Sequence, residues 1–387
     1  MHRAICLADC DSFFASCEQA DNPALRHKAV CVMTGNGIGG IIVSRSKEAK
    51  AAGVKMGEPY FKVKDLYDNV TYLPVRHERY HQISQQIMTI FKSFSPDVEA
   101  VSVDEAYIDL TSLDKLYKSS YTEIIRNIRQ TVWQKVHIPV SIGLSTSKTL
   151  AKLASDLAKK QGGIFVIPPH RSLELVGKTD ICEVCGIGRQ NYRHLQMAGI
   201  FTIAEFVAMS DTQTRKAFGV NGVALKHELL GETVSPVNSK PKPPKSIQDT
   251  SVLSAFCQDK DILRAALNYH IHQACRRLRL WNGFCATAAV MLRTKDFRVE
   301  SAKTKLPIAT NSEQDIAKAA AQLLEQLFRP REVYRSTGIE LCDLSYQDSF
   351  QPSLFDETPQ FKDDKLSQAL DALEEKFGKD IVKTGWL

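Results

Sequence analysis

The sequence predicts an α+β fold, because patterns typical of strands and of helices alternate along the chain. Short apolar runs at residues 4–8, 98–110 and 140–144 are typical of buried strands. Apolar residues also return at helical spacing over residues 80–94 and again over residues 150–158. We therefore expect a sheet with helices packed on one of its faces.

Length and composition indicate a folded protein of more than one domain. The chain has 387 residues, too many for one compact core and enough for about two to four domains. It contains no apolar run long enough to cross a bilayer, and residues 1–7 lack the pattern of a cleaved signal. We expect a cytoplasmic protein without membrane contacts.

Ten cysteines are scattered along the chain without a framework spacing. In a chain without a secretion signal, reduced thiols are expected. Cys182 and Cys185 form a lone CxxC, and a zinc site would need a second pair of ligands that is not evident. We interpret this pair as structural.

The first chemical feature is a set of carboxylates in apolar surroundings. The first strand ends in Asp9, and Asp104 and Glu105 occupy a tight turn between two short strands. Bringing Asp9 beside the other two would raise a pKa unless a cation intervenes. Magnesium takes such hard oxygen ligands, and two ions can activate a hydroxyl and stabilise a leaving pyrophosphate. The alternative, a helix cap or surface turn, is weakened by the apolar sequence around the acidic pair.

Glycine and proline organise the middle of the chain. Residues 181–206 contain Gly186 and Gly188 on either side of one isoleucine, which predicts a helix, a tight turn and a second helix. Glycines at such a turn let backbone N–H groups approach a phosphate. Residues 238–245 are rich in lysine and proline and predict a semi-extended linker.

The last third of the chain has the patterns of a second α+β region. Residues 262–280 and 366–377 have helical patterns, and residues 286–293 alternate as a strand does. Residues 271–305 include eight basic and two acidic side chains, whereas the net charge of the whole chain is only +6. This local excess predicts a surface that binds backbone phosphates.

Three segments resemble, in order and in spacing, the motifs of the Y family of DNA polymerases, the translesion class. They are residues 9–18 (DCDSFFASCE), 102–109 (SVDEAYID) and 145–155 (STSKTLAKLAS). The resemblance covers residues 4–346, and residues 48–59 and 367–379 are similar to the UmuC branch in particular.

The resemblance implies a right-hand polymerase of α+β class, with a small set of domains. These would be a palm at 1–11 and 76–167, small fingers at 12–75, a helix-hairpin-helix thumb at 168–235, a linker at 236–245, an α+β little finger at 246–347, and a tail at 348–387 with a clamp-binding peptide.

It also implies roles for residues within the motifs. Asp9, Asp104 and Glu105 match the catalytic carboxylates that bind two Mg²⁺ ions, with the Cys10 carbonyl as a further ligand. Phe14 matches the steric gate, a ring that clashes with a ribose 2′-hydroxyl, and core packing is its alternative role.

The remaining implied contacts are with substrates and partners. The predicted triphosphate-binding residues are Ser44, Arg45, Lys47, Lys50 and Lys159, where Lys47 and Lys50 replace a tyrosine and an arginine found in several members. The predicted DNA-binding residues are Gly186, Gly188, Arg276, Arg277, Arg279, Arg293 and Lys295. The predicted clamp-binding residues are Gln351, Leu354 and Phe355.

Together these features predict a template-directed DNA polymerase that adds dNTPs to a primer on primer-template DNA, with low fidelity, in translesion synthesis during the SOS response. Expected partners are the sliding clamp, a UmuD-like protein and a recombinase filament. One alternative is a catalytically silent DNA- and clamp-binding accessory protein, which the presence of all three carboxylates disfavours. A nucleotidyl cyclase would share the two-metal chemistry, but the linker and the clamp-like peptide disfavour it.

Overall fold

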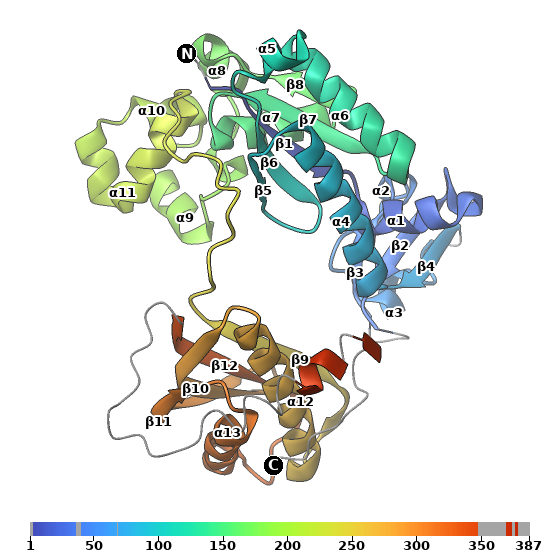
Figure 1. Ribbon diagram of the computed structural model, residues 1–387, viewed down its shortest axis with the longest axis vertical. Helices are drawn as coiled ribbons and strands as arrows, with labels where there is room; N and C mark the ends of the chain where they lie inside the picture. The colour runs from blue at the N-terminus through green and yellow to red at the C-terminus, as the bar shows by residue number, and fades with distance from the viewer. Residues whose placement is uncertain (1–2, 36–39, 68, 347–368, 374–375, 378–387) are drawn as a thin grey trace. The chain divides into compact units, whose positions relative to one another are not determined.

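The computed structural model describes residues 3–35, 40–67, 69–346, 369–373 and 376–377 (Figure 1). The chain forms two compact units, residues 1–241 and 242–387. The division between Pro241 and Lys242 falls within the segment that we expected to be a linker. Within the described ranges, no helix combines the length and the apolar character that a membrane crossing requires.

A five-stranded sheet forms the centre of the first unit. In their side-by-side order, its strands are β5 (Val98–Ala100), β6 (Glu105–Asp109), β1 (Ile5–Cys10), β7 (Val140–Ser145) and β8 (Ile164–Val166). Strand β1 runs antiparallel to both of its neighbours and places Asp9 opposite Glu105 of β6. The three apolar runs predicted as strands therefore all belong to this sheet.

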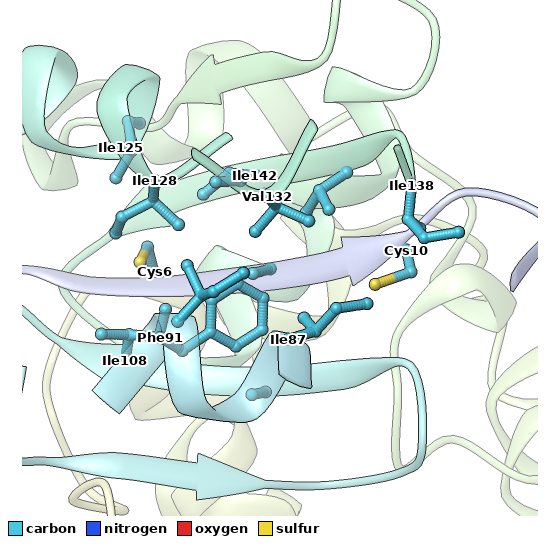
Figure 2. Close-up of a cluster of buried hydrophobic side chains, with 14 of the residues drawn as sticks. Cys6, Cys10, Ile87, Phe91, Ile108, Ile125, Ile128, Val132, Ile138 and Ile142 are labelled. Atoms are coloured by element: carbon cyan, nitrogen blue, oxygen red, sulfur yellow. The ribbon is translucent and has the colours of Figure 1, made fainter. Parts of the chain in front are cut away.

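One face of the sheet is covered by α4 (His77–Phe94) and α6 (Tyr121–Val136). Figure 2 shows Cys6 and Cys10 of β1 among the side chains of these helices, including Phe91. All three side chains are buried, so this layer is the main core of the first unit.

The opposite face is covered by α7 (Lys148–Ala158). Ile5 and Leu7 of β1 pack there against Ala151 of the helix. Our expectation of helices on a single face is therefore wrong. Because successive side chains of a strand point to opposite faces, Asp9 shares the α7 side with Ile5 and Leu7.

The start and the position of α7 are fixed by short local contacts. The hydroxyl of Ser147 caps the helix by accepting a hydrogen bond from Leu150 N at 3.2 Å, and it donates one to Glu228 O at 2.7 Å. At Gly143 of β7, an added Cβ would lie 2.0 Å from Ser155 N of the helix. Only glycine permits this close approach of helix and strand.

A smaller, three-stranded sheet also belongs to the first unit. Its strands, in order, are β3 (Ile42–Arg45), β2 (Ala29–Met33) and β4 (Val70–Pro74). The short helices of the segments around it are α1 (Phe13–Asp21), η1 (Pro23–Leu25), α2 (Lys47–Ala51) and α3 (Tyr60–Val63), and α5 (Leu113–Tyr117) follows β6.

A helical region packs against a second side of α7 and completes the first unit. It consists of η2 (Pro169–Arg171), α8 (Ser172–Val176), η3 (Ile181–Glu183), α9 (Arg189–Met197), α10 (Ile203–Ala208) and α11 (Asp211–Leu229). The predicted helix before the glycine turn is only the single 3₁₀ turn η3. Gly186 has a φ of +100°, a conformation that favours glycine, and Gly188 precedes α9 as its N-cap.

The second unit is a four-stranded antiparallel sheet with two helices packed on it. Its strands, in order, are β11 (Val299–Thr310), β10 (Gly283–Thr294), β12 (Tyr334–Tyr346) and β9 (Ile247–Cys257), and its helices are α12 (Lys260–Arg279) and α13 (Glu313–Leu327). The predicted helix at 262–280 and strand at 286–293 are confirmed. The described part of the predicted helix at 366–377 is helical. All ten cysteines of the chain are free thiols.

Candidate active site

Asp9 and Glu105 form a pair of carboxylates across β1 and β6. The two residues are direct partners in the antiparallel register, and their side chains share a hydrogen bond. Asp9 is only 5% exposed, whereas Glu105 is half-buried. Two acidic groups so close together are stable only if a proton or a cation lies between them.

Helix α7 supplies two ammonium groups to this pair. Lys152 Nζ lies 3.1 Å from Asp9 Oδ2 and also contacts Glu105 Oε1. Lys159 Nζ lies 2.8 Å from the same Asp9 oxygen. Lys159 was among the residues predicted from the sequence, whereas Lys152 was not. Their seven-residue spacing, which places both on one helix face, is the signal that could have found it.

The two carboxylates of the pair have opposite pKa shifts. Burial alone would raise the pKa of Asp9, but the hydrogen bond with Glu105 and the ammonium group of Lys159 outweigh it and lower this pKa. Burial and the neighbouring Asp9 raise the pKa of Glu105. Asp9 is therefore the ionised member, and Glu105 is the one that holds a proton more readily.

Asp104 is next to this pair in the chain, but its side chain has a different partner. The Ser102 hydroxyl donates a hydrogen bond to Asp104 Oδ1 and accepts one from Glu105 N at 3.0 Å. Cys10 N donates a hydrogen bond to Asp104 O at 2.9 Å, which fixes the turn to the end of β1. Across the described residues, no three His, Cys, Asp or Glu side chains lie in an arrangement that could hold a metal ion.

The donor set nevertheless fits a hard divalent cation in its chemistry. Asp9 and Glu105 already share the positive charge of Lys152. Asp9 belongs to β1, and the backbone carbonyl of Asp104 accepts a hydrogen bond from Cys10 N, so both residues lie at the end of this strand. Carboxylate oxygens are the ligands that Mg²⁺ prefers, so these residue types suit the ion although the three side chains do not meet at one point in this structure.

Phe14 lies in the first turn of α1 and is held between two other rings. Its ring stacks on that of Tyr80, with 4.5 Å between the centroids and 16° between the planes. The ring of His77 meets it at 86°, with 6.2 Å between the centroids. Phe14 is half-buried, so it is both packed against the protein and partly open to solvent.

Cations gather beside the start of α1. Lys50 Nζ donates a hydrogen bond to Ser12 Oγ at 2.9 Å. Burial and then the charge of Arg45 lower the pKa of Lys50. Lys47 lines a pocket of about 300 Å³ together with Asp11 and Ser12. Since these positive charges destabilise one another, the region favours an anionic ligand.

Ser44 and Arg45 make their hydrogen bonds within the protein. Ser44 Oγ accepts a hydrogen bond from Ala15 N at 3.2 Å and donates one to Ser12 O at 3.3 Å. The guanidinium group of Arg45 donates to Val54 O. These contacts join β3 to α1 and to the loop after α2. Ser44 and Arg45 therefore support the backbone around the site.

Comparison with known proteins identifies the family. Residues 8–156 match the impB/mucB/samB family, and residues 244–354 match the C-terminal domain of that family. Protein ImpB of Salmonella typhimurium is 31% identical, with 97% of this chain and 91% of ImpB aligned. The chain belongs to this family of Y-family DNA polymerases. It is a DNA-directed DNA polymerase, as the three motifs predict.

Further similarities support this polymerase assignment. Protein UmuC of Salmonella typhimurium strain LT2 is 31% identical over 97% of this chain and 92% of UmuC. DNA polymerase IV 1 of Bacillus subtilis is also 31% identical, and the aligned region covers 99% of this chain and 92% of that polymerase. The predicted similarity to UmuC is confirmed, and the similarity to DNA polymerase IV is equally high.

Solved structures confirm the right-hand polymerase fold. The Y-family DNA polymerase chimera Dbh-Dpo4(243-245)-Dbh is 25% identical, with a TM-score of 0.75 over 89% of this chain and 99% of the chimera. The insertion ternary complex of Dbh DNA polymerase, also 25% identical, has a TM-score of 0.60 over the same shares.

In this Y-family polymerase, the basic residues predicted to bind DNA differ in their surroundings. Arg293 and Lys295 lie exposed at the end of β10, and Arg276 is half-buried on α12. Val290 and Leu292 of β10 point to the helices, so Arg293 lies on the opposite face of the sheet.

Two other arginines of α12 are bound to acidic side chains within the second unit. Arg279 is 7% exposed and pairs with Glu313 and Asp371, so it is not part of an exposed phosphate-binding surface in this structure. Arg277 is more exposed and pairs with Asp249. The predicted clamp-binding residues Gln351, Leu354 and Phe355 lie outside the described residues.

Proposed function

We propose that this polymerase adds dNTPs to the 3′ end of a primer by phosphoryl transfer with two Mg²⁺ ions, in low-fidelity translesion synthesis during the SOS response. The observation that carries the proposal is the Asp9–Glu105 pair, which lies at the end of β1 with Asp104 in the adjoining turn. This arrangement concentrates negative charge at one point of a rigid sheet.

Asp9, Asp104, Glu105 and the Cys10 carbonyl would hold the ions. When bound, Mg²⁺ supplies charge stabilisation for the attacking hydroxyl and the leaving pyrophosphate. The lowered pKa of Asp9 keeps this carboxylate ionised at neutral pH. Lys152 and Lys159 pair with Asp9 and limit the repulsion between Asp9 and Glu105.

The cations beside α1 are suited to the triphosphate of the incoming nucleotide. Lys47, Lys50 and Lys159 would contact its phosphate oxygens. Lys50 bonds to Ser12, Lys47 lines the pocket that includes Asp11 and Ser12, and Lys159 bonds to Asp9. Phe14 would lie against the sugar, where a ring excludes a 2′-hydroxyl by its bulk. The stack on Tyr80 prevents this ring from moving aside.

Duplex binding would rely on backbone contacts. The turn at Gly186 and Gly188 presents backbone N–H groups before α9, a geometry that suits a phosphate. Arg293 and Lys295 are exposed on the second unit and would contact further phosphates. Contacts of this kind do not depend on base sequence, as an enzyme that copies damaged templates requires.

The domain limits and partners implied by the resemblance remain part of the proposal. The palm would comprise residues 1–11 and 76–167, the fingers 12–75, the thumb 168–235 and the little finger 246–347, with a linker between the last two. The sliding clamp would bind through residues 351–355, and a UmuD-like protein and a recombinase filament are further partners. The similarity to UmuC supports this assignment.

Primer extension with the purified chain tests the proposal. Wild-type protein should extend a labelled primer with dNTPs and Mg²⁺, and Asp104→Ala should lose activity by about a thousandfold or more, as loss of a charge-stabilising group typically costs. DNA affinity, measured by fluorescence anisotropy, should change little. Asp114→Asn is the matched control, because Asp114 is a carboxylate of α5 that bonds to Tyr121.

Two results would overturn the proposal. Normal extension by Asp104→Ala would remove this carboxylate from the reaction. Absence of extension by the wild-type protein, with intact DNA binding, would instead favour the catalytically silent accessory protein.

A further inference from the structure

The ring of Phe14 depends on a second aromatic ring for its position. Tyr80 of α4 stacks on it almost in parallel, and Tyr80 itself is 1% exposed. The Phe14 ring packs on the face of the Tyr80 ring, so a shift of Tyr80 would remove the surface against which Phe14 lies. What fixes Tyr80 therefore also determines where the Phe14 ring can lie.

Tyr80 is fixed by a hydrogen bond from its hydroxyl group. The hydroxyl donates to Glu18 Oε1 at 2.6 Å, and Glu18 is 6% exposed. A bond to a charged acceptor in a buried place is stronger than one between neutral groups. Burial and the hydrogen bond with Glu18 raise the pKa of Tyr80, so the hydroxyl remains a donor.

Glu18 is held in turn by a two-pronged contact with Arg76. Arg76 Nε lies 2.8 Å from Glu18 Oε1, and Arg76 Nη2 lies 2.7 Å from Glu18 Oε2. Arg76 Nη2 also lies 2.8 Å from Asp21 Oδ2. This fork leaves the carboxylate with one orientation, which presents Oε1 to Tyr80.

These contacts form a closed circuit between two helices. Phe14 and Glu18 lie one turn apart on α1, and Arg76 and Tyr80 lie one turn apart at the start of α4. Phe14 contacts Tyr80 through the ring stack, and Glu18 contacts both Tyr80 and Arg76 through hydrogen bonds. Both residues of α1 are thus connected to the start of α4. Arg76 is 44% exposed at its side chain, so its ion pair with Glu18 is weak evidence for stability, whereas fixing one arrangement of side chains is an attested role of such pairs.

We propose that Tyr80, Glu18 and Arg76 are positioning residues that set how strictly this polymerase excludes ribonucleotides, by fixing the Phe14 ring. The inference rests on the proposed function of Phe14 as the steric gate. None of the three needs to touch the nucleotide. A ring that is free to tilt leaves room for a 2′-hydroxyl, so loss of the circuit relaxes sugar selection while the phosphoryl-transfer groups stay in place.

The test compares dNTP with rNTP incorporation by Tyr80→Phe, which keeps the ring and removes only the hydroxyl. The readout is kcat/KM for dCTP divided by kcat/KM for rCTP, measured on one preparation, so the fraction of folded enzyme cancels. We expect this ratio to fall by about 10- to 150-fold at most, the order that corresponds to loss of a hydrogen bond to a charged partner. The ratio should fall because kcat/KM for rCTP rises, whereas kcat for dCTP should stay nearly constant.

Glu18→Gln provides an independent second variant, because its amide keeps the shape but cannot accept the full Arg76 fork. It should lower the same ratio. The double variant Tyr80→Phe/Glu18→Gln should be no worse than the stronger single variant, since both remove one interaction. Additive effects would show that the two residues act separately and would overturn the circuit.

Matched controls separate positioning from general loosening. Tyr117→Phe removes a hydroxyl that donates to Phe94 O at 2.9 Å, away from Phe14, and should leave the ratio unchanged. Glu313→Gln removes a buried, arginine-paired carboxylate from the second unit and should also leave it unchanged. An equal fall in Tyr117→Phe and Tyr80→Phe would overturn the inference.

Phe14→Ala distinguishes the failure of the inference from failure of the proposed gate. If Phe14→Ala leaves the ratio unchanged, Phe14 is not the gate and the inference falls with it. If Phe14→Ala lowers the ratio while Tyr80→Phe and Glu18→Gln do not, the gate stands and only the positioning role is overturned.

Discussion

Lys152 connects two acidic side chains that would otherwise repel each other. It contacts both Asp9 and Glu105, and it is 21% exposed at its side chain. The two carboxylates raise the pKa of Lys152, although burial opposes them, so its charge is permanent at any physiological pH. The charge of Lys152 therefore offsets part of the repulsion between the two carboxylates, as a bound metal ion also would.

Replacement of Lys152 by methionine should make the protein more dependent on divalent cations. Loss of the ammonium group leaves a carboxylate pair without this partner, at a cost of about 1–3 kcal/mol in unfolding free energy. Mg²⁺ should then raise the melting temperature more in Lys152→Met than in wild type, because a ligand that binds only the folded state stabilises it. Differential scanning calorimetry with and without MgCl₂ measures both shifts.

Lys160→Met is the control, since Lys160 is exposed just beyond the end of α7. It should respond to Mg²⁺ as the wild type does. Equal Mg²⁺-induced shifts in all three proteins would show that Lys152 and the cation do not share a site.

The position of Asp104 illustrates what sequence can establish about single residues. The motif predicted that three carboxylates lie at the end of β1, and Asp9 and Glu105 do meet there. The orientation of the Asp104 side chain could not be predicted, because it depends on one hydroxyl group, that of Ser102. Lys152 was missed because the prediction stopped at Lys159 and did not extend to the residue seven positions earlier on the same helix face.

Helix α7 is the element that joins the chemistry of the site to the core. It carries Lys152 and Lys159 toward Asp9, packs through Ala151 on the central sheet, and packs through Leu150 on the helical region. Ser147 fixes the start of α7, because its hydroxyl both caps this helix and bonds to the end of α11.

Ser147→Ala should therefore destabilise the protein more than the removal of an ordinary cap. The serine is fully buried, so its loss removes the cap and also leaves Glu228 O without this donor. We expect a loss of about 2–3 kcal/mol in unfolding free energy, above the roughly 1 kcal/mol of a typical N-cap. Urea denaturation followed by circular dichroism measures it.

Ser120→Ala is the matched comparison, because Ser120 caps α6 through a single exposed hydrogen bond to Glu123 N. Its cost should be about 1 kcal/mol or less. If the two variants lose the same stability, the contact between Ser147 and Glu228 contributes nothing.

Most helices and strands could be predicted, because the spacing of apolar residues along the chain differs between the two. The strands at residues 4–8 and 140–144 and the helices at 80–94 and 150–158 all formed where their periodicity placed them. The layer on which a helix packs was not predictable in the same way. The amphipathic pattern of α7 shows that one face of the helix is buried. It does not show on which face of the sheet the helix packs.

On the scale of the whole molecule, each unit has its own apolar core. The core of the second unit includes Leu263 and Leu324 of its helices and Val290 of its sheet. Such a core is what an independently folding domain requires. The chain between the units, residues 238–246, is mostly exposed and contains no helix or strand.

Limited proteolysis should divide the chain at this segment. Trypsin does not cut before proline, so Lys240 and Lys242 are protected and the bond after the exposed Lys245 is the site expected to be cut. The products should be residues 1–245 and 246–387, each retaining its circular dichroism. Lys245→Gln should resist this cut, and rapid degradation of either fragment would show that the units do not fold alone.

The pleat of β1 restricts how this strand can change in evolution or in design. Its even-numbered side chains fill the core beneath α4 and α6, and its odd-numbered ones meet α7, ending in Asp9. Deleting a single residue within β1 would exchange the two sets and bury an acid among isoleucines, whereas deleting a pair would only shorten the strand. A deletion within β1 that keeps both sets of side chains on their own faces must therefore remove an even number of residues.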